Sequence, residues 1–154
     1  MRKERFNYRK MDTNAFKGME ELEQFVKESD VESPLIELVK IRASQINGCA
    51  YCIDMHTKDA REMGETEQRI YGLSVWSETP FYSGREQAAL AWTEALTRIA
   101  EEEITDEFFK EIREHFTEEE MMVLTTAIVA INGWNRIAVG FGNTPGSYKP
   151  EMAR

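Results

Sequence analysis

The chain has two cysteines, Cys49 and Cys52, and a histidine follows them at His56. A thiolate is a nucleophile and a metal ligand, and a neutral imidazole is an acid, a base or a metal ligand near neutral pH. Glu37 stands before them, which gives the spacing Glu-x11-Cys-x2-Cys-x3-His. All of the cysteine chemistry is therefore concentrated in one segment, and any thiol function is predicted to reside there.

A helix that begins near Cys49 would arrange these side chains for redox chemistry. Cys49 would lie in the first turn, where unpaired N–H groups and the helix dipole favour a thiolate. Cys52 and His56 are four residues apart, so they would share a face, and His56 could take and return the Cys52 proton. If the preceding helix packs antiparallel, Glu37 would reach His56 and orient it or relay protons through water.

These roles suggest a peroxide-reducing cycle. Lowering a thiol pKa from about 8.5 to about 6.5 increases reactivity only a few-fold, since nucleophilicity falls with the pKa. Proton delivery to a departing alkoxide is the stronger reason to hold a histidine and a glutamate here. We expect Cys52 to attack the peroxide and Cys49 to form the disulfide. The opposite assignment of the two cysteines stays open.

The surrounding pattern is helical, because apolar residues recur at three- and four-residue steps and no stretch alternates long enough for a strand. The sequence predicts an all-α, single-domain bundle of about seven helices, with the Cys-x-x-Cys motif at the N-terminus of one of them. The expected helices are 13–29, 33–46, 49–64, 66–77, one opening at Ser83, one opening at Thr105, and the longest from Thr117 to about Phe141.

Several local features are predicted along these helices. Ser33 is expected as an N-cap, with Pro34 at the first helical position, and Gly64 as a left-handed C-cap. Capping boxes are expected at 83–86 and 117–120, and Ile104 and Phe109 should form a hydrophobic staple. The buried face of the fifth helix is predicted to comprise Ala88, Ala91, Trp92, Ala95 and Ile99. The tripeptide at 46–48, Ile-Asn-Gly, recurs at 131–133, a match that chance also supplies.

Composition limits the class of protein. The 154 residues fit one domain, 1–154, with 1–12 and 143–154 expected as loose termini or interface arms. A net charge of -9 argues against nucleic acid or an anionic membrane as partner, and the longest apolar run, 128–131, is too short to span a bilayer. The N-terminus lacks a signal-peptide pattern, so a cytoplasmic location is expected. In the cytoplasm a disulfide between Cys49 and Cys52 would close a loop of only three residues and would stabilise the fold by only about 2 kcal/mol. Such a pair suits redox chemistry better than a structural crosslink.

The string LVKIRASQINGCAYC at 38–52 resembles the carboxymuconolactone decarboxylase superfamily, and within it the AhpD-like alkylhydroperoxidases. The Glu37, Cys49, Cys52 and His56 spacing matches the proton-relay signature of those enzymes. The resemblance continues through 88–97 and 131–136, so it extends over most of the chain.

The resemblance implies an all-helical subunit assembled into trimers or hexamers, with dithiol peroxidase or disulfide reductase activity. Cys52 would be the peroxidatic cysteine, and a small hydroperoxide the substrate. The reductant would be a dithiol, for example on a lipoylated or thioredoxin-like protein, and no cofactor or metal is implied. Relatives often have a histidine just before the second cysteine, where this chain has Tyr51. Decarboxylases of the superfamily typically lack the cysteine pair.

Other interpretations remain for the same residues. The cysteines could be inert core residues, or could bind zinc together with His56 and His115, although no second ligand pair of similar spacing exists. The protein could be a non-catalytic redox-responsive oligomer. It could also be a superfamily enzyme that acts on another small substrate.

Overall fold

A computed structural model describes residues 3–5, 7–11 and 14–150. Across those ranges the chain is helical without a strand, as predicted, with seven α-helices and three short 3-10 helices. The α-helices are α1 (Lys17–Lys27), α2 (Ser33–Ile46), α3 (Ala50–Glu62), α4 (Glu67–Gly72), α5 (Gly84–Thr97), α6 (Asp106–Arg113) and α7 (Glu118–Phe141). The 3-10 helices are η1 (Tyr8–Lys10), η2 (Asn14–Phe16) and η3 (Leu73–Glu78).

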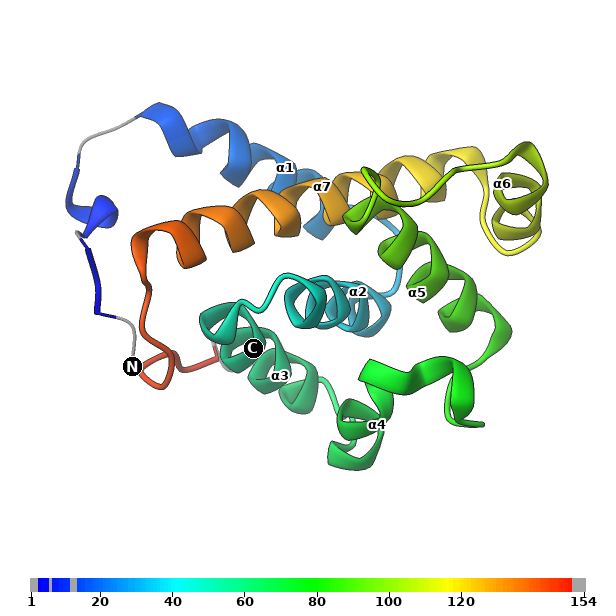
Figure 1. Cartoon of the computed structure of the whole chain (residues 1–154), viewed down its shortest axis with the longest axis horizontal. Helices are drawn as coiled ribbons and strands as arrows, with labels where there is room; N and C mark the ends of the chain where they lie inside the picture. The colour runs from blue at the N-terminus through cyan, green and yellow to red at the C-terminus, as the bar shows by residue number, and fades with distance from the viewer. Residues whose placement is uncertain (1–2, 6, 12–13, 151–154) are drawn as a thin grey trace.

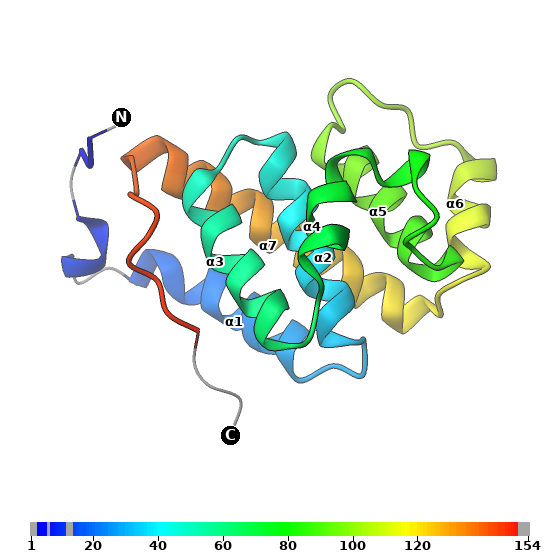
Figure 2. The ribbon, with the colours of Figure 1, turned by 90° about the horizontal axis from the view of Figure 1, so that it is seen from below.

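Two helices, α2 and α7, hold the bundle together. The helix α7 runs along the length of the molecule, with α1 beside it, and α2 lies between α7 and α3 (Figure 1). The helices α5 and α6 cover the end of α7 that begins at Glu118, as a second view shows (Figure 2). The motif helix α3 therefore rests on the most central helix of the fold.

The core explains why α2 is apolar on more than one side. Its residues 35–44 are all buried, because α3, α5 and α7 surround it. Leu38 and Ile41 of α2, and Leu124, Ile128 and Ile131 of α7, are at most 1% exposed. Each such side chain contributes about 1.5–3 kcal/mol through burial of apolar surface. This burial gives the site a rigid support.

The predicted capping boxes are present at two helix starts. The Ser83 hydroxyl accepts from the Glu86 N–H at 3.3 Å, and the Glu86 carboxylate accepts from the Ser83 N–H at 2.7 Å. Thr117 and Glu120 form the same reciprocal pair at the start of α7. Thr105 caps α6, and Gly64 has a φ of +94° just after α3, both as expected.

The start of α2 and the extent of α1 differ from the predictions. The N-cap of α2 is Glu32 and not Ser33, so Pro34 is the second helical residue. Proline is tolerated there because the first turn of a helix has no intrahelical use for its N–H. The α-helix α1 begins only at Lys17, after η2, and residue 13 of the predicted helix 13–29 lies outside the described residues.

The predicted helix 66–77 is not continuous. It is α4 followed by η3, with Val75 at φ -129° and ψ 34°. On one side of this kink Leu73 is fully buried, and on the other the Trp76 indole N–H donates to Glu94 of α5 at 2.8 Å. The burial of Leu73 and the hydrogen bond of Trp76 hold residues 73–76 against the rest of the bundle, and the helix is interrupted at Val75 as a result.

Two residues of the predicted buried face of α5 are less buried than expected. Ile99 is 63% exposed, because α5 ends at Thr97 and the helical period does not continue. Ala91 is only half-buried. Phe109, expected to form a staple with Ile104, is 43% exposed, and its ring lies 5.9 Å from the Trp92 ring.

Both terminal segments are attached where the structure describes them. The Arg5 N–H donates to the Phe141 carbonyl at 2.9 Å, and Tyr8 is buried against the rings of Phe16 and Phe141. Beyond α7, residues 143–150 cross back to α3; this stretch is called the C-terminal strap. The predicted loose tail also includes 151–154, which lie outside the described residues.

By length and composition, α7 is the one helix of the described chain that could cross a membrane. It begins with three glutamates, and it packs against α1, α2 and α5. A core helix of a bundle has the same composition, and its packing accounts for it here.

Candidate active site

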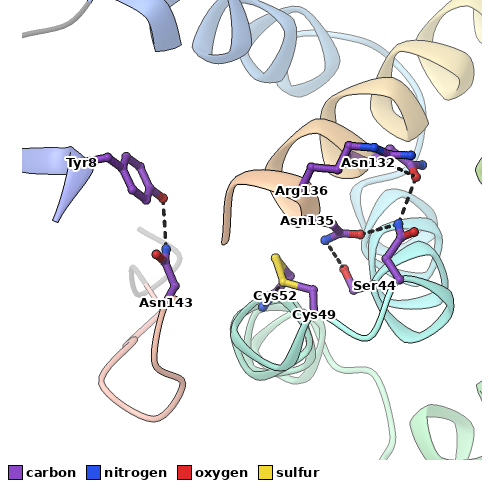
Figure 3. The surroundings of a disulfide bond; sticks show 9 residues. Tyr8, Ser44, Cys49, Cys52, Asn132, Asn135, Arg136 and Asn143 are labelled. Carbon is purple, nitrogen blue, oxygen red and sulfur yellow. Dashed lines mark hydrogen bonds between the residues drawn. A yellow bond between two sulfur atoms is a disulfide. The ribbon is translucent and has the colours of Figure 1, made fainter. Parts of the chain in front are cut away.

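Cys49 and Cys52 form a disulfide at the start of α3, so the structure represents the oxidised protein. Cys49 is the N-cap of α3, and its sulfur accepts from the Cys52 N–H at 3.3 Å. The two Cα atoms are 5.4 Å apart, and each cysteine is only 1% exposed. Figure 3 shows the sulfurs between α3 and α7. The pair lies at the predicted end of the helix, although it is covered by the fold.

A tight turn directs the chain from α2 into this disulfide. Gly48 has a φ of +64°, a conformation that glycine adopts without a Cβ penalty. The Cys49 N–H donates to the Ser44 carbonyl at 3.0 Å, which ends α2 and fixes the approach to α3. The two helices then pack against each other, with Cys52, His56 and Ala60 as the buried residues of α3.

This packing brings Glu37 and His56 together. The Glu37 Oε2 atom lies 2.8 Å from His56 Nδ1, and the two residues are 7% and 6% exposed. Glu37 is in the first half of α2, and His56 is one turn after Cys52 on α3. A carboxylate that accepts Nδ1–H fixes the imidazole tautomer and its orientation, and stabilises the imidazolium when it forms.

Asp59 is a third member of this cluster that the sequence prediction missed. The ligand-type atoms of Glu37, His56 and Asp59 all lie within 4.8 Å of one another. Burial raises the pKa of Asp59, and the Glu37 charge raises it further, against a lowering by the Tyr148 hydrogen bond, His56 and Lys40. Asp59 follows His56 by three residues, so helical spacing was the signal that could have identified it.

The C-terminal strap reaches the same cluster. The Tyr148 hydroxyl lies 2.8 Å and 3.1 Å from the two Asp59 carboxylate oxygens. Lys58 donates to the Tyr148 carbonyl at 3.1 Å, and the Gly146 N–H donates to Asp54 at 2.9 Å. Burial alone would raise the pKa of Asp54, but the bonds from Lys58 and Gly146 lower it. No local pattern near Tyr148 predicts this long-range contact.

The donor groups do not support the zinc alternative. Within the described part of the chain, the one group of three candidate metal ligands is Glu37, His56 and Asp59. The cysteines are joined to each other, and His115 lies beside Gly84, at the start of α5. In the described cluster Glu37 is hydrogen-bonded to His56, and Asp59 is hydrogen-bonded to Tyr148. The atoms that would bind a metal are therefore already engaged in hydrogen bonds.

A polar network lies on the other side of the disulfide, at the surface of α7 that faces α2 (Figure 3). The Asn47 amide donates to Asn132 and to Asn135, both at 2.9 Å, and Asn135 donates to Ser44 at 3.0 Å. Ser44 and Asn135 are at most 1% exposed. The repeated Ile-Asn-Gly tripeptides thus meet through Asn47 and Asn132. They are not equivalent in structure, because Gly48 lies in a turn and Gly133 inside α7.

The fold and the disulfide together define a class: all-helical proteins with a Cys-x-x-Cys motif at a helix N-terminus. The family model for the carboxymuconolactone decarboxylase family matches residues 13–95. The chain belongs to that family, and within it the chain is AhpD-like.

Individual relatives agree with this assignment. The uncharacterised protein YdfG of Bacillus subtilis is 46% identical over 144 residues, which make up 94% of this chain and 98% of YdfG. The crystal structure of ATU0492 from Agrobacterium tumefaciens, a protein of unknown function proposed as antioxidant defence protein AhpD, has a TM-score of 0.89. It is 48% identical, and the match covers 95% of this chain and 100% of that one.

A more distant match shows the shared fold alone. A cysteine-to-alanine variant of the debrominase Bmp8, in complex with 2,3,4-tribromopyrrole, has a TM-score of 0.74 at 18% identity. The match covers 85% of this chain and 70% of that one.

Proposed function

We propose that the protein is a thiol-dependent peroxidase, of the alkylhydroperoxidase type, that reduces a small hydroperoxide with Cys49 and Cys52. The observation that carries the proposal is the buried 2.8 Å contact between Glu37 and His56, one helical turn from Cys52. A disulfide alone would fit an inert crosslink. A disulfide next to a buried acid–base pair fits a reaction that moves protons.

In the oxidative half-reaction the Cys52 thiolate attacks a peroxide oxygen. An S–O bond forms, the O–O bond breaks, and the departing alkoxide takes its proton from His56, which Glu37 orients. The Cys49 thiol then attacks the sulfenic sulfur of Cys52. The S–S bond forms, the S–O bond breaks, and the hydroxyl leaves as water with the Cys49 proton. Two thiols and one hydroperoxide thus give one disulfide, one alcohol and one water.

The burial of the disulfide supports a slender reductant. Because each cysteine is 1% exposed, a thiol fixed on a broad protein surface would reach the sulfurs poorly. A dithiol on a flexible arm, such as a lipoyl group on a partner protein, fits better than a thioredoxin-like surface. Exchange with that dithiol would return Cys49 and Cys52 to thiols.

The proposal extends to assembly and location. Met122 and Val129 are 65% and 55% exposed on the same side of α7, which suits a contact between copies in a trimer or hexamer. Such an enzyme would work in the reducing cytoplasm, where the dithiol form is regenerated, and its net charge of -9 suits neither nucleic acid nor an anionic membrane as partner.

The test is a count of free thiols after rapid mixing of the reduced protein with one equivalent of cumene hydroperoxide. We expect both thiols to disappear quickly and in a one-to-one ratio with the peroxide. Cys52→Ser should abolish the reaction, and Cys49→Ser should leave a sulfenic acid that a dimedone probe traps. The double variant, which lacks cysteine, provides the background. Oxidation only over hours would contradict the peroxidase.

A redox-responsive oligomer without turnover is the competing candidate. It predicts a change in molar mass between the oxidised and reduced forms, which size-exclusion chromatography with light scattering measures. The peroxidase predicts turnover whether or not the mass changes. An enzyme acting on another small substrate, as the fold of Bmp8 illustrates, would show fast disulfide reduction but no reaction with hydroperoxide.

A further inference from the structure

Asp59 is a half-buried titratable group at the α2–α3 interface that the cycle above does not use. It lies one turn beyond His56 on α3, on the side that faces Glu37. Its carboxylate comes within 4.8 Å of both the Glu37 and the His56 donor atoms. A single bridging water spans a separation of up to this limit. Asp59 is therefore close enough to exchange a proton with the pair.

Tyr148 links Asp59 to the strap on the outside of α3. Its hydroxyl reaches both carboxylate oxygens, at 2.8 Å and 3.1 Å, and its ring is half-buried. The strap is itself tied to α3 through Lys58 and Asp54. The order of groups from the core outward is thus Glu37–His56, then Asp59, then Tyr148. A buried acid–base pair needs such a path, because its proton must be replaced after each turnover.

The charges around Asp59 favour a proton in this cluster. Glu37 and Lys40 face it from α2 and His56 from its own helix, while Tyr148 faces it from the strap. The Lys40 ammonium also pairs with Glu23 of α1 at 2.5 Å. The carboxyl groups of Glu23, Glu37 and Asp59 therefore outnumber the one lysine charge near them. Burial is the largest influence on the pKa of Asp59 and raises it.

We propose that Asp59 is a positioning residue through which the Glu37–His56 pair exchanges its proton with solvent, and that Tyr148 holds Asp59 in place for this exchange. The proposal rests on the acid–base role given above to Glu37 and His56. It adds a route for the proton that neither residue supplies, since both are more than nine-tenths buried.

The route acts in both half-reactions. When a dithiol reduces the disulfide, the Cys49–Cys52 bond breaks and a disulfide forms in the reductant. The two protons of the dithiol replace the two that Cys49 and Cys52 lost. A proton that is not transferred directly from the dithiol to a cysteine is released to solvent and enters the site from solvent. In the oxidative step, the proton that Cys52 loses on forming its thiolate leaves to solvent through Asp59, and a proton returns by the same route to His56 for the alkoxide, so the two thiol protons still balance the alcohol and the water.

The test uses the full chain and compares Asp59→Asn, Tyr148→Phe and the control Lys58→Gln. The substitution Lys58→Gln loosens the strap but leaves the Asp59–Tyr148 contact. Stopped-flow rates of disulfide reduction by dithiothreitol and of oxidation by cumene hydroperoxide are measured against pH, at low and high concentrations of imidazole or formate buffer. Small buffer acids replace a missing proton-transfer group, but they do not repair a misfolded site.

We expect Asp59→Asn to slow both reactions about 10-fold or more in dilute buffer, with recovery as the buffer concentration rises. Tyr148→Phe should show a smaller loss of the same kind, and Lys58→Gln should behave as the wild type. The wild-type pH profile should contain a step above the usual range of an aspartate, and this step should be absent in Asp59→Asn. A slow variant that no buffer rescues, or an Asp59→Asn protein with wild-type rates, would overturn the proposal.

The design separates this proposal from the proposed function. If the wild type fails to react with hydroperoxide, the proposed peroxidase function is wrong. The rate of disulfide reduction by dithiothreitol still tests the role of Asp59 in that case. If Asp59→Asn is not folded, Tyr148→Phe carries the same test, since it removes one hydroxyl from a half-buried ring.

Discussion

The Glu37–His56 pair is costly for the fold, which points to a purpose other than stability. Removing a charged group from water costs several kcal/mol, and a close partner returns only part of it. Here the pair lies beside a second carboxyl group, Asp59, whose pKa is raised by burial. For a raised aspartate the protonated form stabilises the fold, and that contribution is lost as the pH rises through the folded pKa.

The substitution Glu37→Gln tests the pair directly. Glutamine retains an oxygen for the His56 Nδ1–H but loses the charge that stabilises imidazolium. We expect the rate of thiol oxidation by hydroperoxide to fall about 100-fold. Thermal stability should stay level or rise, because a buried charge is removed. Parallel rapid-quench kinetics and thermal melts measure the two effects.

Glu23→Gln is the matched control, since it alters the nearby ion pair with Lys40. This variant should lose about 1 kcal/mol of stability and keep its reaction rate. Equal loss of rate in both variants would mean that the local charge balance, and not the Glu37–His56 pair, governs reactivity.

At the site, the sequence predicted the residues near the motif but not the distant ones. The spacing from Glu37 to His56 is local to two adjacent helices, so periodicity alone brings these residues together. Tyr148 reaches Asp59 from 89 positions along the chain, and this contact depends on the path of the strap. Asn135 and Ser44 both lie in segments that carry the family resemblance, but nothing in the sequence indicates that they bind each other.

At the scale of elements, α7 holds the turn that positions the disulfide. Asn135 bridges Asn47 in that turn and Ser44 in α2, and it is 1% exposed. The geometry of Cys49 therefore depends on a helix that begins almost seventy residues later in the sequence.

Asn135→Ala should lower the free energy of unfolding by about 2–4 kcal/mol, because it leaves a cavity and unpaired polar groups in the core. Thr126→Ala, also on α7, should change it by at most about 0.5 kcal/mol. The Thr126 hydroxyl donates to the Met122 carbonyl one turn back in the same helix. Urea denaturation of both oxidised proteins checks the difference, and similar values would show that the network is dispensable.

The helix starts were predictable and the irregular segment was not. Capping boxes are local, and those at 83–86 and 117–120 form as the side chains dictate. The kink at Val75 arises from contacts of Leu73 and Trp76 with other helices, and a helical pattern in 66–77 gives no warning of it.

Two glycines with positive φ permit a further test. A Cβ added at Gly48 would meet no atom within 4 Å, whereas a Cβ added at Gly142 would lie 2.7 Å from the Lys3 carbonyl oxygen. Gly48→Ala should cost about 1 kcal/mol of stability from its left-handed backbone, and Gly142→Ala should cost more. Thermal melts should therefore show a shift of about 2–4 °C for the first and a larger one for the second. The reverse order would contradict the described attachment of residues 3–5.

For the molecule as a whole, Arg85 joins segments that are far apart in the chain. Its guanidinium lies 3.0 Å from Glu32, before α2, and 2.7 Å from Glu120 in α7. Hydrogen bonding to Arg85 lowers the pKa of both carboxyl groups below their usual value of 4.5. The stability that these bonds contribute is present above that value and is lost as the pH falls through the lower folded pKa values.

Arg85→Gln should therefore destabilise the protein by about 1 kcal/mol at neutral pH, with a difference from the wild type that shrinks below about pH 4.5. Melting curves from pH 7 to about pH 3 measure this. Arg61→Gln removes an exposed pair with Glu67 and should show little effect at any pH. A constant difference for Arg85→Gln would indicate lost packing over the Phe116 ring and not lost charge pairing.

The asparagine network has a consequence for the chemical ageing of the protein. Both Ile-Asn-Gly segments contain Asn-Gly, the dipeptide that loses ammonia most readily when the glycine nitrogen attacks the asparagine amide. Here the amides of Asn47 and Asn132 are bonded to each other, Gly48 N–H donates to the Gln45 carbonyl, and Gly133 lies within a helix. The folded chain thus protects two sites that an unfolded chain exposes, so deamidation at these positions during storage would record how often the turn between α2 and α3 opens.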